Sequence, residues 1–226
     1  MLRSVIANKE EIDTNEIEIC DMRRVRLNQA YGNDDFVGEL YFSDQLANGS
    51  GFVNRVFETW NVLLDEILNP SPDSYCGVLI SKNHNCDSAC YNCLKEYRNM
   101  PYHAFLDWRL GLAYLRILGD QDYRCGLDAK FEFFPELHNW LKDAKKATQN
   151  FAQDFECDYT EYGILPGIVS PKAIIVHPLW RTDSYKQDIV ADAAAIAGEG
   201  VQFIDTFKLS RRPGSSYLKL GESGDI

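Results

Sequence analysis

Residues 86–93 read CDSACYNC, and this short stretch decides how the middle of the chain folds. Two of its cysteines, Cys90 and Cys93, have the C-x2-C spacing with which a pair of thiolates holds one metal ion. Cys86 is close enough in sequence to fold back onto the same ion. Because Asp87 and other polar residues interrupt the cysteines, a buried thiol cluster without metal is a poor alternative. The stretch therefore predicts a structural zinc (Zn2+) site without catalysis.

A closed tetrahedral zinc site needs a fourth ligand, and the sequence leaves its identity open. Cys76 would complete a four-thiolate site and is the first choice. His84 and His103 are the alternatives, since imidazole nitrogens also bind zinc. The chain has 7 cysteines, an odd number, and a secreted disulfide framework would usually have an even set. Metal binding in a reducing compartment is therefore the better interpretation of the cluster.

The bulk composition is that of a soluble globular protein, with 226 residues of which 45% are hydrophobic and 25% charged. No run approaches the roughly 20 apolar residues that a membrane-spanning helix needs. The polar, acidic residues 1–20 lack the apolar core of a secretory signal. We therefore expect a cytoplasmic protein with no membrane partner. A net charge of −11 argues against a free-standing nucleic-acid-binding domain, which is typically basic.

Apolar spacing predicts the elements that precede the cysteines. Residues 1–15 are expected to be a polar lead-in, and partial alternation predicts a hairpin of two short strands within 17–27. A further strand is expected at 36–43. A single helix is predicted over 51–68, where apolar residues recur at helical spacing, with its end at the breaker that includes Pro70.

Beyond the cysteines, helices are predicted over 101–118 and 135–150, each with a proline near its start. Residues 172–180, KAIIVHPLW, read as a buried strand, 183–200 as an Ala-rich helix closed by glycine, and 201–207 as a second strand. Strand, helix and strand in this order predict a βαβ unit with parallel strands.

Together these elements predict an α+β protein, with a zinc-stabilised helical and β module followed by a smaller region that contains the βαβ unit. Three segments are expected. They are a lead-in and hairpin at 1–35, a zinc-binding domain at 36–150, and a C-terminal α/β region at 151–226.

Two segments carry a resemblance to a known family. Residues 41–58, YFSDQLANGSGFVNRVFE, resemble a strand–turn–helix with an aspartate and glycines in its turn. Residues 86–115 resemble a zinc segment in which the cysteines are followed by Tyr-x-Asn, a histidine and Leu-Asp-x-Arg-Leu. Both are similar to a helicase-associated C-terminal zinc-binding family. That family occurs at the end of bacterial mitomycin-repair-type DEAD/DEAH helicases and in the helicase-associated subunit of DISARM phage defence.

The resemblance implies roles for individual residues over roughly 36–118. It again makes Cys86, Cys90 and Cys93 metal ligands. Mitomycin-type members carry a cysteine where this chain has Asn99, which leaves the fourth ligand to another residue, Cys76 or His103. The family's turn motif falls on Asp44, Gly49 and Gly51, and the motif after the cysteines falls on Tyr97, Asn99, His103, Asp107 and Arg109.

The resemblance also implies a helicase setting, but the sequence has no G-x-x-x-x-G-K-[ST] phosphate loop and no acidic box to hold magnesium. We therefore expect a non-motor accessory subunit, or the C-terminal piece, of a superfamily-two helicase complex in phage defence or DNA repair. Its expected partners are the helicase ATPase and, within the complex, DNA. The candidate contacts to DNA or to the partner are Lys95, Arg98, Arg109, Arg211 and Arg212.

Two other functions stay open, a scaffold subunit that does not touch DNA and a nuclease that uses the βαβ region. The nuclease is the weaker hypothesis. Asp128, Lys130 and Glu132 are in the wrong order for a restriction-type site, while Cys125 and Cys157 have no neighbouring base that would mark a nucleophile. A lone histidine before proline is more often structural than catalytic, and His177 is interpreted in this way.

Overall fold

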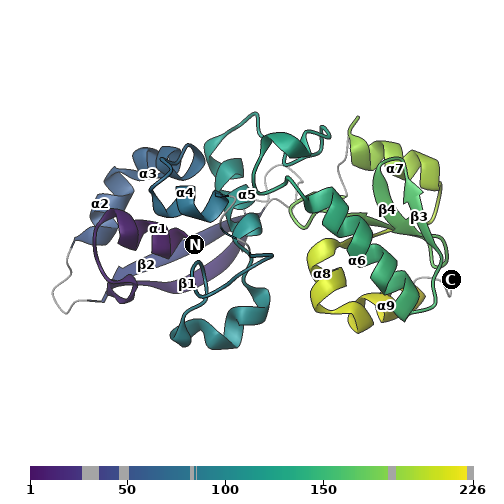
Figure 1. Ribbon diagram of the computed structural model, residues 1–226, viewed down its shortest axis with the longest axis horizontal. Coiled ribbons are helices and arrows are strands. Elements are labelled where there is room, and N and C mark those ends of the chain that lie inside the picture. Colours follow the sequence, from purple (N-terminus) through teal and green to yellow (C-terminus); the bar gives the residue numbers. More distant parts are fainter. Residues whose placement is uncertain (27–35, 46–50, 82–83, 85, 183–186, 223–226) are drawn as a thin grey trace. The chain divides into compact units, whose positions relative to one another are not determined.

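The computed structural model describes residues 1–26, 36–45, 51–81, 84, 86–182 and 187–222. These residues form helices and two small sheets, which confirms the α+β class (Figure 1). The chain forms two compact units, Met1–Asn85 and Cys86–Ile226. No helix in the described ranges is long and apolar enough to cross a membrane.

A two-stranded antiparallel sheet is the centre of the first unit. β1 (Ile17–Arg26) pairs along its length with β2 (Phe36–Asp44). The predicted hairpin within 17–27 is therefore wrong, because this segment is one strand whose partner is the strand expected at 36–43. The register shifts between Ile19 and Asp21. A bulge of this kind interrupts the apolar alternation and makes one strand read as two.

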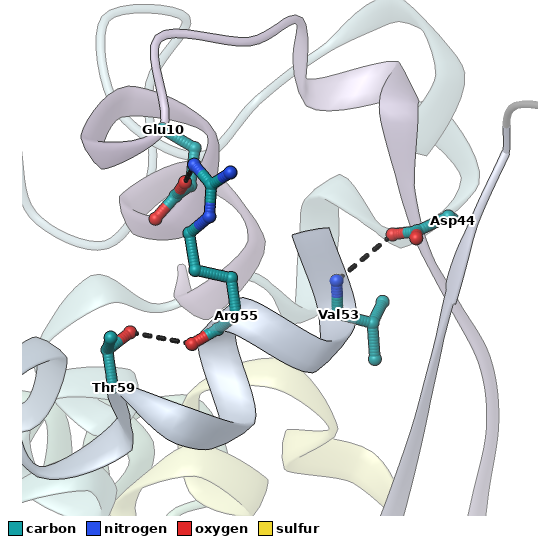
Figure 2. Close-up of polar contacts among 5 residues, drawn as sticks. All are labelled: Glu10, Asp44, Val53, Arg55 and Thr59. Carbon is teal, nitrogen blue, oxygen red and sulfur yellow. Dashed lines mark hydrogen bonds and ion pairs between the residues drawn. The ribbon is translucent and has the colours of Figure 1, made fainter. Parts of the chain in front are cut away.

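Short helices cover this sheet, and they include the segment that was expected to be a lead-in. α1 (Leu2–Lys9) buries its central residues, of which Ile6 is 1% exposed. The helix expected over 51–68 is two helices, α2 (Phe52–Glu58) and α3 (Trp60–Leu68). The hydroxyl of Thr59, between them, donates to the backbone oxygen of Arg55 at 2.8 Å (Figure 2). Such bonds back to the preceding turn favour a bend in a helix.

The most deeply buried side chains of the first unit come from α1, β1 and the apolar face of α3. Ile6, Ile17, Leu63 and Ile67 are each 1% exposed. A last short helix, α4 (Tyr75–Ile80), starts where the hydroxyl of Ser74 accepts a hydrogen bond from Gly77 N. The spacing of apolar residues in 51–68 therefore marks the buried face correctly, although it does not show that the helix is divided at Thr59.

The second unit contains a four-stranded sheet with the order β3-β4-β5-β6. Its strands are β3 (Tyr159–Tyr162), β4 (Leu165–Ile168), β5 (Ala173–Val176) and β6 (Gln202–Asp205). The first three strands are antiparallel, and β5 pairs with β6 in parallel. α7 (Ile189–Ala197) connects the parallel pair, which confirms the predicted βαβ unit.

Alternate residues of β5 belong to two apolar cores on opposite faces of this sheet. Ile174 and Val176 pack in the cluster that contains α7. Ala173 and Ile175 pack in the other cluster, with Phe151 and with Leu209 and Leu220. Those residues come from α6 (Trp140–Asp154), α8 (Thr206–Arg211) and α9 (Pro213–Glu222), which lie together in Figure 1.

Both helices expected after the cysteines begin later than predicted. Residues 101–118 contain part of the 3-10 segment η3 (Tyr97–Phe105) and then α5 (Trp108–Gly119), which is capped by Asp107. α6 begins at Trp140 rather than at 135. The short 3-10 segment η4 (Phe131–Phe133) precedes α6, and the turns between them are held by a buried ion pair of 2.7 Å between Glu136 and Arg116.

The predicted division at residues 35 and 150 differs from the one in the structure. Residues 1–35 and 36–150 share one sheet, because β1 pairs with β2. The expected boundary at 150 falls inside α6, whose residue Phe151 belongs to a core of the second unit. Long-range pairing of this kind cannot be read from local composition.

Candidate metal centre and a neighbouring pocket

Four side chains around the CDSACYNC stretch form a group that could hold a metal ion. The ligand atoms of His84, Cys86, Cys90 and Cys93 all lie within 4.8 Å of one another. The Sγ atoms of Cys86 and Cys93 are 3.9 Å apart, and those of Cys90 and Cys93 are 3.6 Å apart. Zinc–sulfur bonds of about 2.3 Å in a tetrahedron place sulfur atoms about 3.8 Å apart. The thiols therefore already have the spacing that one tetrahedral ion requires.

A tight turn at Cys90 brings its thiol to that of Cys93. Three consecutive amides converge on the backbone oxygen of Cys90, those of Cys93 and Leu94 at 3.1 Å and that of Lys95 at 2.9 Å. In return, Cys90 N donates to the Sγ atom of Cys93 at 3.0 Å. This turn explains how two cysteines separated by only two residues bring their thiols together.

His84 is oriented for a ligand role by a backbone contact. Its Nδ1 atom is 2.8 Å from the backbone oxygen of Leu79. Because a carbonyl oxygen only accepts, Nδ1 must carry the proton, and Nε2 is then the ring nitrogen with the lone pair that a metal requires. Metal-binding histidines almost always have a second contact of this kind.

The other two candidates for the fourth ligand are not members of the group. Cys76, the first choice from the sequence, is 3% exposed on α4, and burial raises the pKa of its thiol to about 11. It behaves as a small apolar core residue. His103 uses Nε2 for contacts with the backbone oxygen of Glu96 at 3.0 Å and Oδ1 of Asn99 at 2.8 Å. Among the described residues, the group that could hold a metal ion therefore contains His84 and not Cys76.

The thiols of the group resist ionisation in the absence of a cation. Burial raises the pKa of the Cys86 thiol to about 12, and the nearby Cys93 and Cys90 thiols add to this effect. Burial also raises the pKa of Cys93. Three packed thiolates would repel one another, and a bound cation removes this cost because it holds the thiols as thiolates.

The first turn of α5 binds the backbone of residues 86–93, which we call the metal loop. Arg109 Nη1 donates to the backbone oxygen of Cys86 at 3.1 Å and also to that of Asp87. Trp108 donates through Nε1 to the backbone oxygen of Cys86 at 3.2 Å, and through its backbone N to that of Ser88 at 2.9 Å. Asp107 starts this helix, because it accepts from Arg109 N at 2.9 Å and from Leu110 N. Asp107 and Arg109 therefore act on the loop together.

The segment after the cysteines is braced by Asn99. Its side chain accepts from Glu96 N at 2.9 Å and donates to the backbone oxygen of Leu94 at 2.8 Å. His103 is attached to the same residue. Tyr97, by contrast, is 83% exposed. Of the motif implied by the family resemblance, Asn99 and His103 have structural contacts, and Tyr97 faces solvent.

The turn motif belongs to the first unit, where Asp44 joins the end of β2 to the start of α2. Its carboxylate accepts from Gly51 N at 2.9 Å and from Val53 N at 3.1 Å, and Figure 2 shows the second of these bonds. Gly51 has a φ of 78°, a conformation that favours glycine. An ion pair of 2.7 Å between Arg55 and Glu10 ties α2 to the end of α1 (Figure 2). Gly49 lies outside the described residues.

A pocket of about 600 Å³ lies within the second unit, beside the metal loop. It is formed by the residues that follow Cys86, the first turn of α5, one face of α6, the end of β5 and the start of α8. It contains two of the five candidate contact residues, Arg109 and Arg211. Lys95, Arg98 and Arg212 do not line it, and the guanidinium of Arg212 lies 5.6 Å from the ring centre of Phe105.

Cys125 contacts His177, although the sequence predicts no base near that cysteine. Cys125 Sγ is 3.6 Å from Nδ1 of His177, and the two residues are 4% and 2% exposed. Burial raises the pKa of the Cys125 thiol to about 12 and lowers that of His177 to about 3. Both groups are therefore neutral, and the thiol has no thiolate character for nucleophilic attack. Since the residues are 52 positions apart, no sequence motif marks the pair.

The residues weighed for a nuclease form separate surface ion pairs. Lys130 pairs with Asp128 at 3.1 Å, and Glu132 lies 2.9 Å from Nδ1 of His138.

Neither a scan against protein-family models nor searches of curated proteins and of solved structures found a match for this chain. The contacts of the metal loop and of the pocket are therefore the observations from which a function can be proposed.

Proposed function

We propose that the chain is a zinc-stabilised, non-motor accessory subunit, or the C-terminal piece, of a superfamily-two DNA helicase complex in bacterial phage defence or DNA repair. The observation that carries this proposal is the contact of Arg109 with the backbone oxygens of Cys86 and Asp87. Arg109, one of the residues on which the family resemblance rests, binds the backbone beside Cys86, and Asp107, another, caps the helix that carries Arg109. These contacts support the proposal because they give two of the matching residues a shared structural role.

Zinc is the metal that fits the proposed site. Three thiolates and one imidazole are a common structural set for zinc, which prefers tetrahedral geometry and soft ligands. With four protein ligands no position remains for water or substrate. The ion then has a folding role, which suits a loop whose side chains are too polar to form their own core.

The absence of a phosphate loop from the sequence assigns the motor activity to a partner ATPase. The net charge of −11 further limits direct DNA binding to a local surface or to a position beside a basic partner. Arg109 and Arg211, which line one pocket, are the candidates for that local surface.

The test is to purify the tagged chain from its native host, measure its metal content and identify the proteins that accompany it. We expect about one zinc per chain and a helicase ATPase. Cys90→Ser should lose the metal and the partner together. Cys157→Ser, a change of a half-buried cysteine outside the group, should keep both. A protein that is recovered alone and free of metal would contradict the proposal.

A second measurement separates the accessory role from a scaffold that does not touch DNA. The recovered complex is titrated with DNA at increasing salt, with and without this chain. An accessory subunit that contacts phosphates makes the slope of log affinity against log salt steeper, because more counterions are released. An unchanged slope would support the scaffold instead.

A further inference from the structure

We propose that the pocket of the second unit binds a nucleotide unit that carries a single phosphate, either free or within a DNA strand. The suggestion that the nucleotide belongs to a DNA strand rests on the proposed function, whereas the chemistry of the pocket does not. The pocket lies at the carboxyl ends of the parallel strands β5 and β6, where His177 and Thr206 follow the strands directly. Open α/β sheets bind ligands at this edge. Its volume of about 600 Å³ is in the usual range for small-molecule sites.

His177 supplies a fixed hydrogen-bond donor to the pocket that it lines. Its Nδ1 atom accepts a hydrogen bond from Leu179 N at 3.2 Å, so the proton of the neutral ring is on Nε2. Among the residues that the structure describes, none is hydrogen-bonded to this Nε2 atom. The side chain is 2% exposed and its ring is held against Trp140 and Trp180. A buried donor in such a position is suited to a ligand oxygen.

Thr206 adds a second donor at the start of α8. Its Oγ1 atom accepts a hydrogen bond from Nε1 of Trp140 at 3.2 Å, which leaves the hydroxyl hydrogen to point elsewhere. Trp140 and Thr206 both line the pocket. The carboxyl end of the sheet therefore offers two neutral donors before any charged group is considered.

The charges around these donors favour one phosphate over several. Lys146 and Arg211 are cations on the pocket wall, and both suit a phosphate group. Two carboxylates of the wall have protein partners: Glu136 pairs with Arg116 through Oε1, although its buried Oε2 has no hydrogen-bond partner in the described part of the chain, and Asp107 caps α5. Asp87 and Asp143 also line the pocket. Their charges would repel the second and third phosphates of a triphosphate.

Aromatic side chains and the same carboxylates fit a base better than a bare anion. Trp140 and Phe207 line the pocket, and because the ring of Trp140 already stacks on Phe131 with ring centres 5.5 Å apart, Phe207 is the aromatic side chain for a base, with the guanidinium of Arg211 5.8 Å from its ring centre. Flat apolar faces of this kind stack on nucleobases. Asp143 and Asp87 can accept hydrogen bonds from the amino groups of a base. A mononucleotide has both features, an anionic end and a flat ring with donors.

The experiment is isothermal titration of the metal-loaded full chain with deoxyadenosine monophosphate, inorganic phosphate, ATP and a single-stranded oligonucleotide. We expect the monophosphate to bind more tightly than inorganic phosphate and ATP. Arg211→Gln and Lys146→Gln should each weaken it about tenfold, as expected for loss of a charge-assisted hydrogen bond. The matched controls are Lys208→Gln on α8 and Lys142→Gln on α6, which lie outside the pocket and should change affinity less than about twofold.

Three results would overturn the assignment: no binding of the monophosphate, equal affinity for inorganic phosphate, or an equal effect of the control variants. Circular dichroism melts of the variants exclude unfolding as the cause of a loss. An oligonucleotide that competes with the monophosphate identifies a strand as the source, and one that does not compete identifies a free nucleotide. Because the chain is titrated alone, the result is independent of whether a helicase accompanies it.

Discussion

At the residue scale, His84 and Cys76 show what decides a metal ligand. Both are near the cysteine stretch in sequence, and both side chains are chemically suitable. His84 has its Nδ1 atom fixed by the backbone oxygen of Leu79, and it belongs to the metal-binding group. Cys76 is buried in α4. The sequence predicts the grouping of Cys86, Cys90 and Cys93 well, because their spacing is local. The identity of the fourth ligand depends on where α4, which carries Cys76 and precedes His84, ends.

We expect His84→Ala to weaken zinc binding by at least about tenfold, because it removes one of four ligands. Cys76→Ala should leave zinc affinity unchanged and lower only the free energy of unfolding, since its thiol packs in the core. Competition with a zinc chelator measures both affinities. The reverse pattern, with zinc lost from Cys76→Ala alone, would restore the four-cysteine site.

His177 gives the second unit a predicted sensitivity to acid. Burial lowers its pKa to about 3, whereas in the unfolded chain the pKa is about 6.5. Between these values the unfolded chain binds a proton that the folded chain does not, so the free energy of unfolding falls as pH falls through this window. From pH 7.5 to 5.0, His177 should account for a loss of about 2 kcal/mol.

Urea unfolding at both pH values measures this loss, with His177→Asn as the comparison. The variant should lose less stability than the original chain. Burial raises the pKa values of Asp107 and Asp143, and these groups contribute to both proteins, so the difference isolates the histidine. An equal loss in both proteins would show that His177 is already protonated or exposed in the folded state.

At the element scale, side-chain hydrogen bonds to the backbone mark two helix boundaries that the sequence prediction missed. Asp107 starts α5 after η3, and Thr59 separates α2 from α3. Apolar periodicity does not report these breaks, because it continues across them. The parallel pair β5 and β6 was predictable because an apolar strand, an Ala-rich helix and a second strand follow one another directly. The bulge in β1 made one continuous strand look like two, because it interrupts the apolar alternation.

Asp44 is the cap with the clearest consequence. Asp44→Ala removes the acceptor for Gly51 N and Val53 N at the start of α2 and should cost about 1–2 kcal/mol of unfolding free energy. Asp44→Asn keeps one oxygen and should cost less. Thermal and urea unfolding measure both changes, with Glu58→Ala on the exposed face of α2 as control. A loss for the control as large as for Asp44→Ala would remove the capping role.

At the scale of the whole molecule, the sequence predicts the fold class but not the contacts between distant residues. The composition and the strand–helix–strand pattern give the α+β class. The pairing of β1 with β2, the contact of Cys125 with His177 and the pocket beside the metal loop join residues distant in sequence. Such contacts depend on the tertiary fold, and no local pattern specifies them. The cysteine stretch is the exception, since the spacing of its three thiols is set by a few consecutive residues.

We propose that residues 86–93 fold around one zinc ion held by His84, Cys86, Cys90 and Cys93, the four side chains that form a possible metal-binding group. X-ray absorption at the zinc edge of the purified full chain tests it most directly. We predict three sulfur ligands at about 2.3 Å and one nitrogen at about 2.0–2.1 Å. A shell of four sulfurs, a water oxygen in the first coordination sphere, or a protein without zinc would contradict the claim.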